Sequence, residues 1–256
     1  MSKPITNPNA VPNLDDLMAR FLATAGGTEI DAAIESEVEP HEVIGGFRAA
    51  ATQLWREGIA VFAGVTTEKV TTPPEWAGFA ALETHKSSPF AAGLFPQSLR
   101  EISPLLTGGE LTSLKPTGKP PTIPGFSALR SWCQKNLSQG HAATLLVTSG
   151  ILAGLGDFAQ AKAALLAAEP LCNGALRVLW HNQHAAVLWM SGEVTQAVAA
   201  WEQATDCVPA RFNLGMASLL TGNKPVAVQH LTVAATSLPD SSGWCHLARL
   251  YLALAS

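Results

Sequence analysis

Two histidines, His181 and His184, lie three residues apart in a stretch whose apolar periodicity predicts a helix. Side chains at this spacing share one helix face, so the pair is close enough to bind one metal ion. A metal site needs further ligands, and the spacing does not favour the remaining candidates, Cys172 and His141. We therefore predict no metal site here and expect both histidines to contact helix carbonyls or a bound peptide.

A cluster of six carboxylates lies between residues 29 and 42. Glu35, Glu37 and Glu39, next to His41, offer the oxygen ligands that a hard cation prefers. The cluster lacks the glycine turn and the asparagine or carbonyl ligands of a calcium-binding loop. We interpret it as a solvated acidic face or the start of a helix.

Two glycine patterns invite a nucleotide-binding interpretation. Residues 154–159 match G-x-G-x-x-A, which binds dinucleotides only between a strand and a helix, and no second strand pattern follows. Gly118 and Lys119 are followed by Pro120, where a phosphate-binding loop needs Ser or Thr for Mg²⁺. No nucleophile elbow or Ser/His/Asp set is apparent either. The sequence therefore predicts no catalytic residue, no cofactor and no enzymatic activity.

Three glycines, Gly156, Gly192 and Gly222, are each followed by small or bulky apolar residues five, nine and twelve positions later. These residues are Ala161, Leu165 and Ala168; Ala197, Trp201 and Ala204; and Ala227, Leu231 and Ala234. Steps of four and three residues place each set on one face of a helix. Glycine suits the left-handed backbone at the end of a preceding helix, so the pattern predicts three helix hairpins.

The spacing continues at offset seventeen with Pro209 and Pro239, which we expect to end the second helix of their hairpins. A first-helix pattern returns at the C-terminus as Trp244, Leu247, Ala248 and Tyr251. Together these features resemble the tetratricopeptide repeat (TPR), over about residues 140–256 and about three and a half hairpins. The turn glycines are 36 and then 30 residues apart, where about 34 is expected. The alternative is a non-repeating helical bundle.

The composition limits the classes of partner that the protein is expected to bind. Hydrophobic residues make up 47% and charged residues 14%, below the ~25% of typical soluble domains. So few charges predict a large buried interface or a homo-oligomer. The net charge of −4 argues against nucleic-acid binding. Residues 1–12 do not form a signal peptide, and no apolar run is long enough to span a membrane. We expect a cytoplasmic protein.

We predict an all-α fold with a helical N-terminal domain and a C-terminal TPR-like array. Residues 1–12 are expected to be a disordered lead-in. Residues 13–106 form the N-terminal domain, which resembles no family. Residues 107–125 are rich in proline and glycine and predict a linker. Residues 126–256 form the repeat domain.

Within the N-terminal domain we expect helices over residues 40–62 and 96–106, although residues 59–65 also fit a short strand. Another helix is expected to begin at Thr72, with Glu75 completing a capping box. The four scattered cysteines are interpreted as small buried apolar residues.

The TPR resemblance implies that the first helix of each hairpin lines a concave groove, which binds an extended peptide or a partner helix. The residues that it places on the groove wall are Asn182, Ala186, Trp189, Met190, Phe212, Met216, Leu219, Leu220, Cys245, Arg249 and Leu252. Chaperone-binding members clamp a C-terminal carboxylate in this groove. Leu146 and Gly150 stand where that clamp needs a lysine and an asparagine, so we do not expect it here.

Two hypotheses follow. The first is a non-enzymatic interaction module or scaffold, whose apolar groove binds a protein partner mainly through Trp189 and Met216. The alternative to this binding groove is that the N-terminal domain fills the groove internally and leaves no free binding site. The second is a small enzyme or a metal- or ligand-binding protein with a site between the two helical domains, for which His181, His184 and Glu35 would matter.

Overall fold

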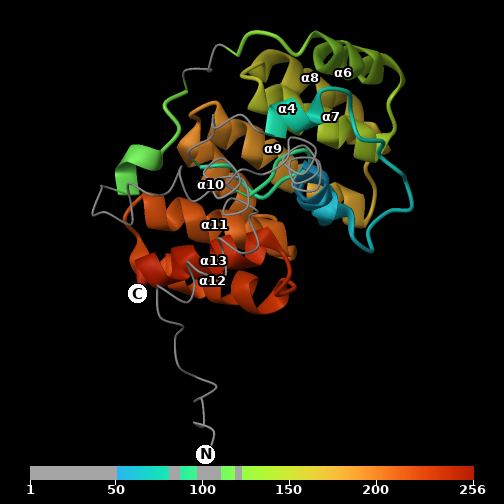
Figure 1. Ribbon diagram of the computed structural model, residues 1–256. Helices are drawn as coiled ribbons and strands as arrows, with labels where there is room; N and C mark the ends of the chain where they lie inside the picture. Colours follow the sequence, from blue (N-terminus) through green and yellow to red (C-terminus); the bar gives the residue numbers. More distant parts are fainter. Residues whose placement is uncertain (1–50, 81–86, 97–110, 119–122) are drawn as a thin grey trace, which may run out of the picture.

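The computed structural model describes residues 51–80, 87–96, 111–118 and 123–256 (Figure 1). The acidic cluster at residues 29–42, the lead-in and most of the helix expected at residues 96–106 lie outside these ranges. All regular elements in the described ranges are helices, and none is a strand. The predicted all-α fold is therefore confirmed.

The C-terminal half is a curved array of antiparallel helices (Figure 1). The helices are α6 (Ser127–Gln139), α7 (Ala142–Gly154), α8 (Phe158–Ala168), α9 (Ala175–Met190), α10 (Val194–Glu202), α11 (Val208–Leu220), α12 (Lys224–Ser237) and α13 (Gly243–Ala255). Helices α7 and α8, α9 and α10, and α11 and α12 form three successive hairpins, and α13 packs against α12. Adjacent helices therefore pack as a helical repeat does.

The three hairpins turn in the same way. Gly156, Gly192 and Gly222 have φ angles of 80°, 84° and 85°, in the left-handed region. The residue after each glycine donates its N–H to the carbonyl five positions earlier, at 2.8, 2.9 and 2.8 Å. This is the hydrogen bond of a Schellman motif, which satisfies the last carbonyls of the first helix. The predicted turn glycines are confirmed.

The small-residue faces are buried as expected. None of the nine apolar residues that follow the turn glycines is more than 4% exposed. Trp201 is fully buried between the helices of its hairpin, and its indole N–H donates to the Asn182 carbonyl at 3.3 Å. The alanines on either side of such a large ring allow the helices to approach closely.

The prediction for Pro209 is wrong. Helix α10 already ends at Glu202, and Pro209 lies in the first turn of α11. A proline that lacks an N–H is tolerated there, because the first N–H groups of a helix have no partner within it. The early end of α10 accompanies the short interval of 30 residues between Gly192 and Gly222.

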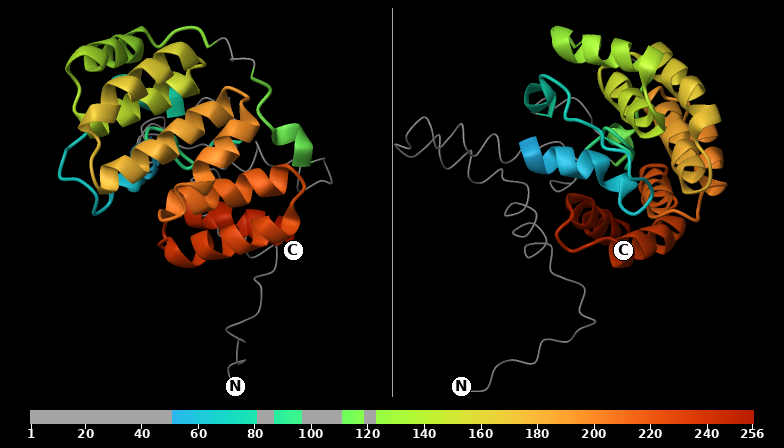
Figure 2. Two further views of the ribbon diagram at one scale, coloured as in Figure 1. Left: turned by 180° about the vertical axis from the view of Figure 1, so that it is seen from behind. Right: turned by 90° about the vertical axis from the view of Figure 1, so that its right-hand side faces the viewer.

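The described N-terminal elements lie on the inner side of the array, as Figure 2 shows for residues 51–59. These residues are helical and continue into η1 (Ala60–Phe62), so the alternative of a strand at residues 59–65 is wrong. The remaining elements are α4 (Trp76–Ala80), η2 (Leu111–Leu114) and η3 (Glu169–Leu171). One continuous hydrophobic cluster joins Trp55, Trp76 and Phe79 to the buried face of the array.

Three glutamates of the N-terminal half accept hydrogen bonds from the first residues of array helices. Glu75 Oε2 accepts from two N–H groups at the start of α6, both at 3.1 Å. Glu68 Oε2 accepts from Ala143 in α7 at 2.8 Å, and Glu57 Oε1 accepts from Gly243 in α13 at 3.1 Å. A carboxylate is stabilised there by the unpaired N–H groups and by the helix dipole.

The capping box expected within α4 is wrong. Helix α4 begins only at Trp76, and Glu75 precedes it with a φ angle of 58°. The carboxylate of Glu75 therefore caps a helix that follows about fifty residues later instead of its own.

Candidate peptide-binding groove

A non-helical stretch of the chain, residues 87–96 (SSPFAAGLFP), crosses the inner side of the array; we name it the groove segment. Phe90, Ala91, Ala92 and Leu94 are each at most 2% exposed. Its hydrogen bonds to the array come from α9 and α11, the first helices of the central and third hairpins. Residues 87–96 of the chain itself thus fill the concave face, as the alternative of a groove filled by the N-terminal domain expects.

Two asparagines bind the main chain of Phe90. The Phe90 N–H donates to Asn213 Oδ1 at 2.6 Å, and Asn213 Nδ2 donates to the Phe90 carbonyl at 3.1 Å. Asn182 Nδ2 donates to the same carbonyl at 2.9 Å, and its own Oδ1 accepts from Asn213 Nδ2 at 2.9 Å. Both asparagines are at least 99% buried. They satisfy one another and the peptide group that they bind.

Gln183 repeats this pairing two residues further along the groove segment. Its Oε1 accepts from the Ala92 N–H at 2.8 Å, and its Nε2 donates to the Ala92 carbonyl at 3.1 Å. The N–H and C=O groups of Phe90 and of Ala92 are thus all paired with carboxamides. The side chains of α9 and α11 therefore bind the main chain of the segment at two alternate residues.

Aromatic side chains enclose Phe90. Its ring stacks on Trp244 of α13 at a centroid distance of 4.4 Å and an interplanar angle of 14°. It meets Phe212 of α11 edge to face at 6.0 Å. At the first residue of the groove segment, the Trp189 indole N–H donates to the Ser87 carbonyl at 3.0 Å. Offset and edge-to-face ring pairs stabilise beyond the area they bury.

The groove segment approaches α7 closely through two glycines. Gly93 has a φ angle of 80° and lies within a turn in which the Leu94 N–H donates to the Ala91 carbonyl at 3.2 Å. A Cβ on Gly93 would lie 2.5 Å from the Val147 carbonyl oxygen, and one on Gly150 would lie 1.8 Å from that of Ala92. Only glycine permits this approach of two backbones.

Only some of the residues predicted to line the groove wall contact the groove segment. Asn182, Trp189 and Phe212 contact the groove segment directly. The buried residues without a hydrogen bond or ring contact to it are Ala186, Met216, Leu219 and Leu220. Met190 and Leu252 are partly exposed. Cys245 donates to Ala235 of α12, and Arg249 forms an ion pair with Asp240, so these two interact outside the groove.

Sequence reasoning missed four residues that contact the groove segment: Gly150, Gln183, Asn213 and Trp244. It considered Gly150 only as a missing ligand of a carboxylate clamp, and Trp244 only as part of the repeat pattern. The carboxamides of Gln183 and Asn213 lie on helix faces that are buried. A polar residue on a face expected to be buried was the available signal, because such a group requires a specific partner.

The two histidines flank Trp180. The His184 ring stacks on the indole at 5.4 Å, and the His181 ring meets it edge-on at 5.1 Å. Burial is the main cause that lowers the pKa of both imidazoles, and nearby cationic groups add to it. Among the described residues, no three side chains of His, Cys, Asp or Glu lie close enough together to bind a metal ion.

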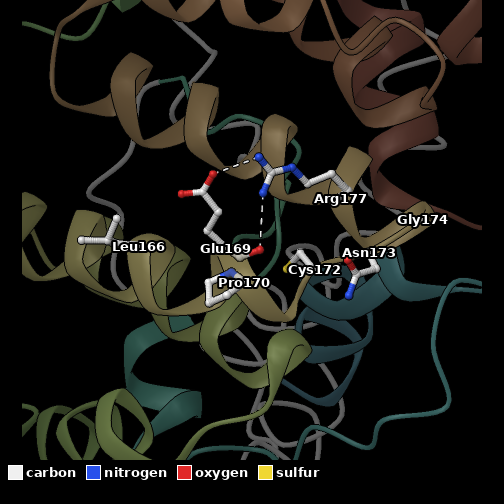
Figure 3. Close-up of a pocket in the computed structure, with 7 residues that line it drawn as sticks. All are labelled: Leu166, Glu169, Pro170, Cys172, Asn173, Gly174 and Arg177. Carbon is white, nitrogen blue, oxygen red and sulfur yellow. Dashed lines mark hydrogen bonds and ion pairs between the residues drawn. The ribbon is translucent and has the colours of Figure 1, made fainter.

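An open pocket of about 570 Å³ is lined by residues from the end of α8, from η3 and from the start of α9 (Figure 3). Its two charged side chains pair with each other, since Arg177 donates to Glu169 Oε1 at 2.9 Å. Burial raises the pKa of the Cys172 thiol on its wall, so this sulfur is a poor nucleophile. The pocket offers no set of groups for acid–base or nucleophilic chemistry.

Comparison of the chain with protein families, with curated proteins and with solved structures found no match. The structure shows the coarser content of the TPR resemblance, which is a series of packed antiparallel helix pairs. Within the described ranges, no helix combines the length and the apolar character needed to cross a membrane.

Proposed function

We propose that the protein is a non-enzymatic interaction scaffold of the TPR type, whose concave groove binds an apolar, non-helical segment of a protein partner. In the isolated chain the groove segment occupies this place. The observation that carries the proposal is the binding of the Phe90 and Ala92 main chain by Asn182, Gln183 and Asn213. Main-chain hydrogen bonds of this kind provide affinity for a peptide, and side-chain pockets provide specificity.

The three carboxamides support a peptide rather than a helix as the ligand. A buried carboxamide without a partner destabilises a protein by about 1–3 kcal/mol, so these groups need a partner with free N–H and C=O groups, which Phe90 and Ala92 supply in the isolated chain. The inner peptide groups of a helix are already paired with one another. Of the two ligands that the TPR resemblance implies, the groove chemistry therefore favours the non-helical segment.

A cytoplasmic location and assembly with further copies belong to the same proposal and rest on composition alone. An enzyme with a site between the two helical parts has less support. In the described residues, apolar side chains and the main chain of the groove segment fill the interface between these parts.

The test uses a full-length variant with Phe90→Asp and Ala92→Asp, which we name the opened chain. Both side chains are 2% exposed, and a carboxylate buried without a partner is costly, so the segment should leave the groove. A fluorescent peptide of residues 87–96 is then titrated and its anisotropy measured. We expect the opened chain to bind it at least about tenfold more tightly than the wild type, whose groove is filled.

The control peptide carries the same two aspartates and should not bind. Circular dichroism and light scattering establish that the opened chain remains helical and monomeric. A folded opened chain that fails to bind the native peptide would overturn the proposal.

A second format leaves the groove segment itself unchanged, in case the opened chain does not fold. Protease recognition sequences are inserted between residues 84 and 85 and between residues 108 and 109, and both are cut after purification. The released piece contains the groove segment and should exchange with an excess of labelled peptide. Loss of the released piece without binding of the labelled peptide would equally contradict the proposed function.

A further inference from the structure

We infer that Asn173 and Gly174 form a deamidation site, at which water converts the Asn173 carboxamide to a carboxylate without the help of an enzyme. They are the one Asn–Gly pair in the sequence of 256 residues. Both line the pocket at the start of α9 and neither contacts the groove segment, so the inference is independent of the proposed function.

The reaction uses the main-chain nitrogen that follows the asparagine. The Gly174 nitrogen loses its proton to hydroxide and attacks the side-chain carbonyl carbon of Asn173. A new N–C bond closes a five-membered succinimide ring, the bond from that carbon to the amide NH₂ breaks, and ammonia leaves after taking a proton from water. Water then opens the ring at either carbonyl and gives aspartate or isoaspartate. No electrons are transferred, so water is the only co-reactant.

Glycine in the second position leaves the attacking nitrogen unhindered. Gly174 has φ and ψ angles of 54° and −126°, and a Cβ built on it would meet no atom within 4 Å. Asn173 and Gly174 are both exposed. Since glycine also has the widest choice of backbone angles, the chain can rotate until the nitrogen meets the side-chain carbon.

Hydrogen bonds do not restrain the two reacting groups. The Gly174 N–H precedes α9, at the end where a helix leaves its first N–H groups unpaired, and it has no acceptor among the described residues. In Figure 3 no hydrogen bond joins the Asn173 carboxamide to another residue of the pocket. The loop is held through its carbonyls instead, which accept from the Leu176 N–H at 3.2 Å and from the Arg177 N–H at 3.1 Å.

The other asparagines of the described ranges lack this combination. Three lie inside helices, where the following N–H is bound within the helix and the carboxamide donates to a carbonyl: Asn136, Asn182 and Asn213. Asn223 is exposed like Asn173 and also directly precedes a helix, but Lys224 follows it. Asn223 is therefore the matched comparison within the same chain.

The product changes the charge of the pocket and leaves the fold intact. A carboxylate at position 173 lies beside the N-terminus of α9, whose first turn holds no acidic residue, and the helix dipole favours a negative charge there. The pocket then carries one negative charge more than the balanced pair of Glu169 and Arg177. The formal net charge of −4 becomes one unit more negative.

The experiment incubates the full-length protein at pH 6 and at pH 8 and then digests it. Mass spectrometry measures the exchange of NH₂ for OH at each asparagine, and an isoaspartyl methyltransferase with a labelled methyl donor detects isoaspartate. We expect Asn173 to react at least about tenfold faster than Asn223, because only Asn173 is followed by glycine. The reaction should be faster at pH 8 and should yield both products. Equal rates at the two asparagines, or a product without isoaspartate, would overturn the inference.

Variants and a peptide separate the contribution of the loop from that of the sequence. Asn173→Gln lengthens the side chain and so removes the five-membered ring, and Gly174→Ala places a Cβ beside the nitrogen. Both should suppress the reaction in chains that circular dichroism shows to be folded. A free peptide of residues 169–178 should react at a rate comparable to the folded protein, and a protein that stays intact while the peptide reacts would show that the loop blocks the attack. Asn173→Asp supplies one product directly, and a urea midpoint below that of the wild type would contradict the intact fold.

Discussion

Asn213 and Phe90 are 123 residues apart in the sequence, yet one carboxamide pairs with both the N–H and the C=O of one residue. The pairing joins the third hairpin of the array to the N-terminal half. It is fully buried, so water cannot replace either hydrogen bond without opening the groove.

Replacement of Asn213 by alanine should therefore destabilise the protein by about 2–3 kcal/mol, because it leaves the buried Phe90 N–H without an acceptor. The matched control is Asn136→Ala in α6, whose carboxamide donates only to the Trp132 carbonyl within its own helix. We expect that change to cost less than about 1 kcal/mol. Urea unfolding followed by circular dichroism measures both, and equal losses would show that the groove hydrogen bonds contribute nothing specific.

The Glu57 carboxylate should stabilise the fold through its hydrogen bonds as well as through its charge. Its carboxylate is 5% exposed and accepts from the Ser242 hydroxyl at 3.0 Å and from the Gly243 N–H at 3.1 Å. Glutamine has one acceptor oxygen and no charge for the helix dipole, so Glu57→Gln should destabilise the protein by about 1–3 kcal/mol. Glu202→Gln, at an exposed position, should change stability by less than about 0.5 kcal/mol. Thermal unfolding of both variants tests this difference.

Two of the turn glycines allow a comparison between backbone strain alone and backbone strain combined with a steric clash. Gly222 has a φ angle of 85° and open space around its missing Cβ, so Gly222→Ala should cost about 1–2 kcal/mol. Gly192 has nearly the same φ angle, but a Cβ there would lie 2.7 Å from Gly118 Cα. Gly192→Ala should therefore be the more destabilising change in chemical unfolding, and an equal loss at both sites would argue against this backbone contact.

Burial of Cys133 predicts a loss of stability in alkali. Burial raises the pKa of its thiol to about 12, from an ordinary value of 9.0. Above pH 9 the unfolded chain releases this proton while the folded chain keeps it. The contribution to stability is therefore complete below pH 9 and is lost as the pH rises toward 12, by up to about 1.4 kcal/mol per pH unit.

The measurement compares urea midpoints of the wild type and Cys133→Ala at pH 8 and pH 10. Both proteins should lose stability between these values, because burial also raises the pKa of the other three thiols. The variant should lose less. A parallel decline of both proteins would show that the Cys133 thiol does not titrate as inferred.

Much of the array could be predicted from the sequence because its determinants are local. A glycine with positive φ and apolar residues in steps of four and three fix a hairpin within about twenty residues. Pro209 shows the limit of such reasoning. A proline near a helix boundary is compatible both with the end of one helix and with the first turn of the next, and only the packing of α10 and α11 decides between them.

The groove segment could not be predicted because it has no periodicity of its own. Its conformation depends on Asn182, Gln183 and Asn213, which follow it by about 90–120 residues in the sequence. Glu75 was misinterpreted for the same reason, because its partners in α6 are more than fifty residues away. The domain boundary placed at residues 107–125 remains a prediction, although the buried Leu114 shows that part of this stretch packs against the core.

The position of Trp244 has a consequence for synthesis of the chain. This residue covers Phe90 and lies in the first turn of α13, so it is synthesised after the groove segment and after helices α6 to α12. Until then the apolar groove segment lacks one wall of its site, although the segment was made much earlier. A nascent chain with exposed apolar surface is prone to aggregation and is a substrate for chaperones. Truncation before α13 would make that unfinished state permanent, so α13 completes the site of the groove segment instead of merely covering the end of α12.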